Sequence, residues 1–341
     1  MKSNTIFTKA LLSLIMALLL CFPKVSLEGA RTGLLLWYDT VLPTLLPFMV
    51  CTNLLISINA VNFITAPFAP ILSRLLGLSK NGCFVLLNGA LCGYPMGAKS
   101  CSDFLVQGSL SPEEARCLYA VSSFPSPMFL AGFVMAKAAL AAGQRMVPFW
   151  KLALSIYLPV IPMFFLASGI YHFPGNHLHS FRPAGTKPCT GPGIFSLSKA
   201  PGSSSPGILA PAPGLHPPRL SLDEALMSSI EVMVKIGGYL MIFSILASFL
   251  KRLLPSGLLR TLLIAAAEMT TGIQEISLTV PGLFGVRLIL AAAAFGGLSG
   301  IFQVKSVTKN VGLSIRHYTL WKIIHGLSVW GILTLLEAYP H

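Results

Sequence analysis

Apolar runs close to the length of a membrane-spanning helix recur along this chain and restrict what it can fold into. Only 10% of its 341 residues are charged and 54% are hydrophobic, whereas a soluble globular domain has about 25% charged residues. The runs lack the short alternating strands of a closed barrel, and a spanning helix needs roughly 20 apolar residues. The sequence therefore predicts an all-α polytopic membrane protein with about seven to nine membrane segments.

The N-terminal apolar run follows two lysines, as the apolar part of a signal peptide does. No small-x-small cleavage site follows it between Pro23 and Gly29. We therefore expect an uncleaved N-terminal transmembrane helix within residues 1–23. The next run, residues 34–58, carries two prolines, which kink or break a helix.

Residues 172–219 differ in composition from the rest of the chain. They contain ten prolines and seven glycines and no acidic residue. Such a segment cannot bury a core, so we expect a disordered or extended linker. It separates a first half, residues 24–171, from a second half, residues 220–341.

The two halves present the same order of segments. In each, a long span precedes a glycine-broken segment, a second broken span and a plain span. The breaks lie at 89–99 and 120–131 in the first half, and at 266–276 and 293–304 in the second. If the first broken segment of each half is a re-entrant hairpin, each half crosses the membrane three times and the halves are inverted repeats. Paired interrupted segments are the best sequence indication of a transport site.

The net charge of +13 comes from basic residues that sit singly between the apolar runs. The positive-inside tendency explains such a distribution without a nucleic-acid partner, and attraction of an anionic solute is a second possible reason. With the N-terminus inside, Lys251, Arg252 and Arg260 fall on the wrong side of the membrane.

The first broken segment contains Gly89, Gly93 and Gly97 at intervals of four residues. This spacing is typical of a helix contact face, but Pro95 cuts the helix there and favours a hairpin tip with exposed amides. We place Gly93, Gly97 and the neighbouring residues Tyr94 and Lys99 at a substrate site. Lys99 could pair with a substrate carboxylate, or it could extend to the membrane interface.

The second break places Ser122, Ser123 and Ser126 around two prolines. The prolines free backbone groups beside three hydroxyls, which suits a polar solute in a low-dielectric cavity. The alternative is a kinked helix whose serines satisfy its own backbone.

Glu268 lies inside an apolar run, where an ionisable group indicates function by default. It could bind a donor-rich solute or carry a coupling proton. The structural alternative is an internal ion pair with Lys99 or Lys235. The polar and small residues placed in the same cavity are Thr270, Thr271, Gly297, Ser299 and Gln303.

The chain lacks the H-E-x-x-H, G-x-S-x-G, P-loop and G-x-G-D motifs, and we expect no enzymatic activity. Its histidines at 172, 177 and 179 have no supporting ligands, so we expect neither a metal site nor a cofactor. The expected partners are the lipid bilayer and a small-molecule substrate, with a homo-oligomer as a further option.

Five strings together resemble a known family: LPTLLPF at 42–48, GYPMGAK at 93–99, SSFPSP at 122–127, EMTTG at 268–272 and FGGLS at 295–299. The chain, apart from its linker, resembles the YlbJ-type sporulation integral membrane proteins. These belong to the wider group that shares the Gate domain of nucleoside and ferrous-iron transporters.

The resemblance implies two Gate-like repeats and a place in the outer forespore membrane of a spore-forming bacterium. It also implies transport of dipicolinic acid, a flat pyridine dicarboxylate, into the forespore. The serines at 122 and 123 stand where the family pattern has Asn-Asn or Asn-Ser, so the side-chain chemistry of that break can differ. Two alternatives stay open: a nucleoside-type transporter and a non-transporting membrane assembly factor for sporulation.

Overall fold

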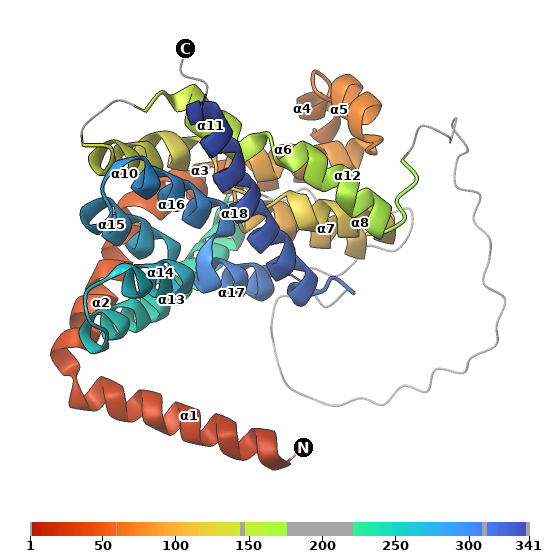
Figure 1. Cartoon of the computed structure of the whole chain (residues 1–341). Helices are drawn as coiled ribbons and strands as arrows, with labels where there is room; N and C mark the ends of the chain where they lie inside the picture. The colour runs from red at the N-terminus through yellow and green to blue at the C-terminus, as the bar shows by residue number, and fades with distance from the viewer. Residues whose placement is uncertain (1, 59, 144–146, 176–220, 309–311, 339–341) are drawn as a thin grey trace, which may run out of the picture.

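The computed structural model describes residues 2–58, 60–143, 147–175, 221–308 and 312–338, and every regular element in these ranges is a helix (Figure 1). The predicted all-α class is confirmed. Within these ranges, five helix runs are long and apolar enough to cross a membrane: Pro23–Ser57, Phe149–Ile170, Leu222–Leu253, Gly282–Val307 and Ile315–Glu337. A sixth is added if the pair Ala69–Leu76 and Lys80–Cys92, bent by 105°, counts as one span. The larger number predicted included paired helices of 10 to 13 residues, which are too short to cross alone.

The first half begins with α1 (Lys2–Cys21), which extends away from the other helices (Figure 1). Next, α2 (Pro23–Leu36), η1 (Trp37–Val41) and α3 (Leu42–Ser57) form one continuous run. η1 is a turn of π-helix directly before two prolines, whose missing N–H groups interrupt the helical ladder. The prolines therefore widen this helix locally and do not end it.

The other helices of the first half are α4 (Val61–Thr65), α5 (Ala69–Leu76), α6 (Lys80–Cys92), α7 (Met96–Val106), α8 (Pro112–Val121), α9 (Pro127–Phe129), η2 (Leu130–Val134), α10 (Met135–Ala141), α11 (Phe149–Tyr157) and α12 (Val160–Ile170). The second half contains α13 (Leu222–Leu253), α14 (Leu258–Ala267), α15 (Met269–Thr279), α16 (Gly282–Phe295), α17 (Gly297–Val307) and α18 (Ile315–Ala338). A capping box starts α13: the Ser221 amide donates to the Glu224 carboxylate (2.8 Å), and the Glu224 amide donates to the Ser221 hydroxyl (3.2 Å).

The helices before and after the predicted linker follow a similar order, apart from α4 and α5, which have no counterpart after α13. A long helix run, α2 to α3 or α13, precedes two short helices that pack on each other, α6 with α7 or α14 with α15. A helix interrupted near its middle follows, α8 to α10 or α16 to α17. The half ends with α11 and α12 or with α18.

The halves share one apolar core. Val134 and Ile156 of the first half are fully buried in the same cluster as Ile276, Ile289 and Val329 of the second. The longest helix of the second half, α13, also packs closely on α2. The predicted linker lies outside the described residues except for residues 172–175.

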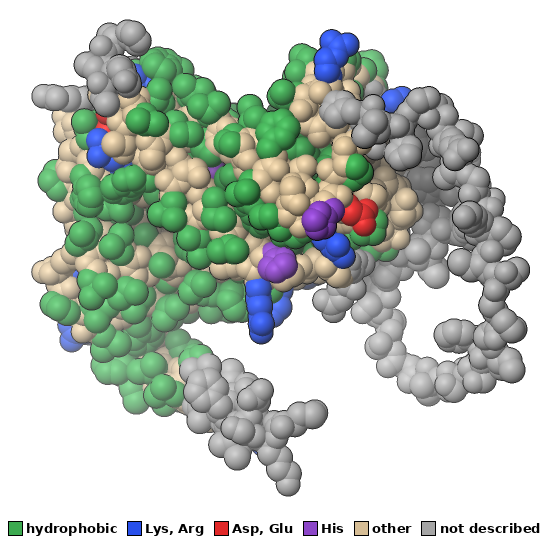
Figure 2. All heavy atoms as spheres, turned by 45° about the vertical axis from the view of Figure 1, so that its right-hand side comes forward, with side chains coloured by type: hydrophobic (Ala, Val, Ile, Leu, Met, Phe, Trp, Pro, Cys, Tyr) green, Lys and Arg blue, Asp and Glu red, His purple; other side chains and the backbone are tan. Residues whose placement is uncertain are grey.

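Large apolar side chains cover the outer surface of the helices, as Figure 2 shows for one face. Val234, Leu327 and Leu335 are each at least 60% exposed on helices long enough to span a bilayer. Lipid is the solvent that such a surface requires. The chain is a multi-pass membrane protein.

Candidate functional site

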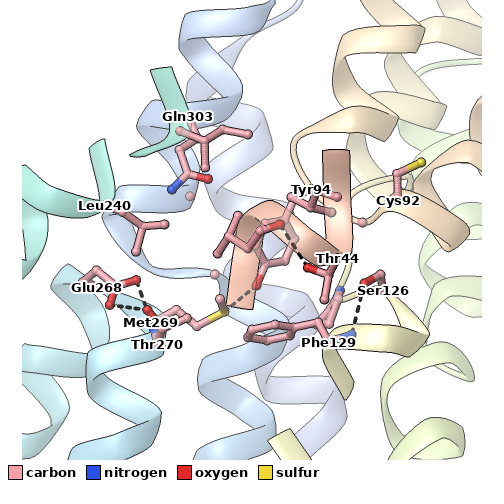
Figure 3. A pocket seen from close by; sticks show the side chains of 17 residues that line it. Thr44, Cys92, Tyr94, Ser126, Phe129, Leu240, Glu268, Met269, Thr270 and Gln303 are labelled. Atoms are coloured by element: carbon pink, nitrogen blue, oxygen red, sulfur yellow. Dashed lines mark hydrogen bonds between the residues drawn. The ribbon is translucent and has the colours of Figure 1, made fainter. Parts of the chain in front are cut away.

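A cavity of about 50 Å³ lies where four helix breaks meet (Figure 3). Each break contributes to its lining: Gly93 and Tyr94 between α6 and α7, Ser126 before α9, Glu268 between α14 and α15, and Gly296 between α16 and α17. Thr270 in the first turn of α15 and Gln303 of α17 line it as well. Thr44, just beyond η1, and Leu240 of α13 complete the wall with Phe129 and Met269. Segments far apart in the sequence therefore form one small, mainly apolar site with a few polar groups.

The glycines of the first hairpin have two different roles. Gly93 has a φ of +76°, lines the cavity and ends α6. A Cβ at Gly89 or Gly97 would overlap the backbone carbonyl of Ser122. Gly93 thus forms the hairpin tip, whereas Gly89 and Gly97 provide the helix contact face.

Tyr94 connects the first half to the second across the cavity. Its hydroxyl lies within hydrogen-bond reach of the Met269 sulfur and of the Ala293 carbonyl oxygen, at 3.2 Å from the latter. Figure 3 marks the contact with the Met269 sulfur by a dashed line. The ring is part of the cavity lining.

The serine-rich break is held by one of its own hydroxyls and by side chains of two other helices. The Ser126 hydroxyl caps α9 by accepting from the Phe129 amide (3.3 Å), and it lines the cavity. The Ser123 carbonyl accepts from Lys322 Nζ (2.7 Å), and the Pro125 carbonyl accepts from the Tyr157 hydroxyl (3.0 Å). Ser122 and Ser123 lie behind the cavity wall.

Glu268 is 2% exposed and caps the second hairpin's outgoing helix. Its carboxylate accepts from the Thr270 amide (3.0 Å), the Thr271 amide (2.6 Å) and the Thr270 hydroxyl (2.7 Å). An acid at the start of α15 also suits the helix dipole. The residue was singled out correctly as buried within an apolar run, but its capping role was not predicted.

The ion pair proposed for Glu268 with a lysine is wrong. Lys99 pairs with Asp103 one turn further along α7 (2.7 Å), and Lys235 pairs with Glu231 (2.8 Å). Lys99 therefore does not line the cavity, because its short-range partner holds it away.

The last break is made by two glycines in the left-handed region, Gly296 (φ +84°) and Gly297 (φ +68°). Two consecutive residues of this conformation restrict the position to glycine. Gly297 lies against the Met269 amide and does not line the cavity. The Ser299 hydroxyl accepts from the Gln303 side-chain amide (3.0 Å), so Ser299 orients Gln303 from outside the lining.

Six of the predicted site residues line the cavity: Gly93, Tyr94, Ser126, Glu268, Thr270 and Gln303. Seven lie outside the lining: Gly97, Lys99, Ser122, Ser123, Thr271, Gly297 and Ser299. Whether this set binds a substrate stays a prediction.

Sequence reasoning missed the buried cation Lys322 and its neighbour His325 on α18. The His325 ring nitrogen Nε2 lies 2.9 Å from the Ile156 carbonyl oxygen. The sequence signal that could have identified both is an ionisable residue inside an apolar run. Lys322 was not selected because it is near the start of its run, where a lysine usually extends to the interface.

The fold and this cavity define a multi-pass helical membrane protein with a site built from helix breaks. The chain is similar to the sporulation integral membrane protein YlbJ of Bacillus subtilis (strain 168). The two are 25% identical over an alignment of 355 positions, which covers 96% of this chain and 81% of that protein. No model of a protein family and no solved structure matches the chain. The comparison supports a membrane role in sporulation.

Proposed function

We propose that this chain is a membrane transporter of a small solute, built from two inverted Gate-like repeats. The observation that carries the proposal is the convergence of breaks from both halves on one cavity. Interrupted helices at matching positions of two halves form the binding site in many transporters. Freed backbone groups at membrane depth are tolerated where protein or a cavity covers them, as here.

The small volume of the cavity supports a closed conformation around the site. A water needs roughly 10–15 Å³ of such volume, so about 50 Å³ accommodates only a few waters. A solute with a ring requires the hairpins to move apart. Alternating access by rocking of one repeat against the other would provide that movement.

Dipicolinic acid, carried across the outer forespore membrane into the forespore, is the substrate we propose. The relative's sporulation role and the sequence resemblance support it. The aromatic and thioether side chains of Tyr94, Phe129 and Met269 suit a flat ring. The amides at the start of α17, which has no side-chain cap, would receive a carboxylate.

Gly300 offers a direct test because it lines the cavity and a Cβ added to it would have no atom within 4 Å. Gly300→Leu should fill the cavity without a clash at Cβ and abolish solute movement. Gly331→Leu, on the exposed side of α18 with equally open space, is the matched control. Dipicolinate is measured in spores of a strain that lacks the gene and is complemented with each variant, with its synthesis in the mother cell assayed alongside.

The expected result is normal synthesis with empty spores for Gly300→Leu, and full spores for Gly331→Leu and the wild type. Full spores without any copy of the gene would reject dipicolinate as the substrate. Nucleoside uptake and competition would then test the nucleoside-type alternative. Full spores with Gly300→Leu at normal membrane levels, while the deletion is defective, would favour the non-transporting assembly factor.

A further inference from the structure

One lysine lies buried among three of the four helix breaks. Lys322 of α18 is 2% exposed, and its Nζ donates to the Ser123 carbonyl at 2.7 Å. The same ammonium lies 5.2 Å from the centroid of the Tyr94 ring. Its Cε would be 3.8 Å from a Cβ built on Gly296. Among the described residues, none of the ion pairs includes Lys322.

This position is costly for a residue that only fills space. A buried cation at membrane depth is strongly disfavoured unless it is paired. One carbonyl and one aromatic face compensate in part, and an ammonium has three donors. An apolar side chain would fill the same place at lower cost, so packing alone does not account for a lysine here.

Tyr94 separates this cation from the cavity. The ring lines the cavity, and Lys322 Nζ, which does not, lies 5.2 Å from the ring centroid. Its hydroxyl is held by a thioether sulfur, a weak acceptor, and by a carbonyl of α16 at 3.2 Å. On the remaining side Gly296 has no side chain to obstruct an approach. Rotation of the Tyr94 side chain would therefore join Lys322 to the cavity.

We infer that Lys322 binds a carboxylate of the transported solute when the Tyr94 ring rotates away. The inference rests on the proposed transport function and adds the positive charge that the cavity lining lacks. An aromatic dicarboxylate would place one carboxylate at Lys322 and the other at the amides that start α17. Glu268 is compatible with such an anion because its oxygens already accept three hydrogen bonds at the start of α15.

The test uses the purified full chain in proteoliposomes, with uptake of labelled pyridine-2,6-dicarboxylate compared with its neutral isostere, pyridine-2,6-dicarboxamide. Loss of a hydrogen-bonded charge contact weakens binding by about 10- to 100-fold. Lys322→Gln should therefore lose about that factor of preference for the dicarboxylate, and Lys322→Arg should retain more of it. Lys305→Gln is the matched control, because Lys305 is an exposed lysine that also lies over an aromatic ring, that of Phe302 (5.9 Å).

If the wild type takes up the dicarboxylate and Lys322→Gln keeps the same preference for the dicarboxylate over the dicarboxamide, this inference is overturned and the transport proposal stands. No dicarboxylate uptake by the wild type would overturn both. If Lys322→Gln does not fold, the rate at which Lys322 is acetylated in the wild-type protein is measured by mass spectrometry instead. Saturating dicarboxylate should slow that acetylation at least about tenfold relative to the dicarboxamide, and equal rates would reject the inference.

Discussion

The two short helix pairs, α6 with α7 and α14 with α15, occupy the same place in their halves but are held by different chemistry. The first pair is fixed by close packing and neutral hydrogen bonds. The Asn88 side-chain amide donates to the Ser100 hydroxyl at 2.5 Å, and the Thr52 hydroxyl donates to Asn88 at 3.2 Å. The second pair is also closely packed, since a Cβ at Gly272 would overlap the Ala265 backbone, but it adds carboxylates, Glu268 at its break and Glu275 on α15.

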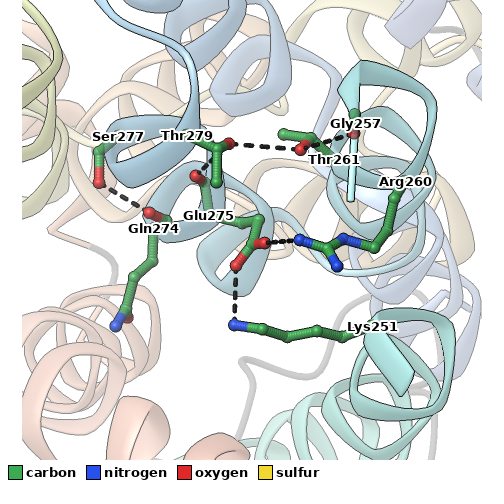
Figure 4. Close-up of polar contacts among 8 residues, drawn as sticks. All are labelled: Lys251, Gly257, Arg260, Thr261, Gln274, Glu275, Ser277 and Thr279. Atoms are coloured by element: carbon green, nitrogen blue, oxygen red, sulfur yellow. Dashed lines mark hydrogen bonds and ion pairs between the residues drawn. The ribbon is translucent and has the colours of Figure 1, made fainter. Parts of the chain in front are cut away.

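Glu275 joins three helices of the second half (Figure 4). Its carboxylate accepts from Arg260 of α14 at 3.1 Å and from Lys251 of α13 at 3.0 Å. These two cations contradicted the positive-inside orientation, and pairing with a buried acid gives a structural reason for their position. The first pair is interlocked with the backbone of α8 at Ser122, whereas the second is tied to α13 by an ion pair, which can exchange partners or water. We therefore expect the second pair to move during transport and the first to remain fixed.

The largest expected effect tests the packing of the first pair. Gly97→Val would drive a branched side chain into the Ser122 carbonyl, and overpacking of this kind costs about 3 kcal/mol or more where backbone must shift. We expect little folded protein, measured as the monodisperse fraction in detergent. Gly169→Val, on α12 with open space around it, should behave as wild type. A well-folded Gly97→Val protein would show that the first pair is not rigid.

Glu268→Gln tests the charged break of the second pair. The amide retains one acceptor but presents an NH₂ group to donors, so we expect a loss of about 1–2 kcal/mol of stability, as for a lost helix cap. If this break forms the site, uptake per folded protein should fall by more than the loss of stability accounts for. Thermal unfolding and uptake are measured on the same preparation.

Glu231→Gln is the control for that comparison, since Glu231 is an exposed acid of α13 that also pairs with a lysine. It should change stability by less than about 0.5 kcal/mol. Equal changes in stability and in uptake for Glu268→Gln and Glu231→Gln would show that Glu268 has no special role.

The two cations around Glu275 should differ in their contribution. Arg260 is 14% exposed and Lys251 is 59% exposed in their side chains. Arg260→Met leaves the buried Glu275 with only the exposed partner, and we expect a loss of about 1–3 kcal/mol. Lys251→Met should cost about 0.5 kcal/mol or less. Equal melting temperatures for the two variants would contradict the view that Glu275 is held mainly from within the hairpin.

The positions of the breaks could be predicted because they depend on local residue types. Prolines and glycines with positive φ favour helix ends, so the breaks before Ser126 and at Gly296 were visible in the sequence. The capping role of Glu268 was not, because it depends on the residue at which α15 starts. Lys322 was missed since its burial follows from how α18 crosses the other helices. The convergence of the breaks on one cavity is likewise a tertiary property.

Lys99 provides the smallest expected effect and the sharpest check on whether charge matters in the first pair. Its ammonium pairs with Asp103 on the same helix, and both side chains are about one fifth exposed. Such an i,i+4 pair contributes about 0.3–0.5 kcal/mol, so Lys99→Met should lower the melting temperature only slightly. Because Lys99 does not line the cavity, uptake should be retained and should remain selective for the dicarboxylate. Abolished uptake at normal membrane levels would place a functional cation on α7 and make the two hairpins alike in chemistry.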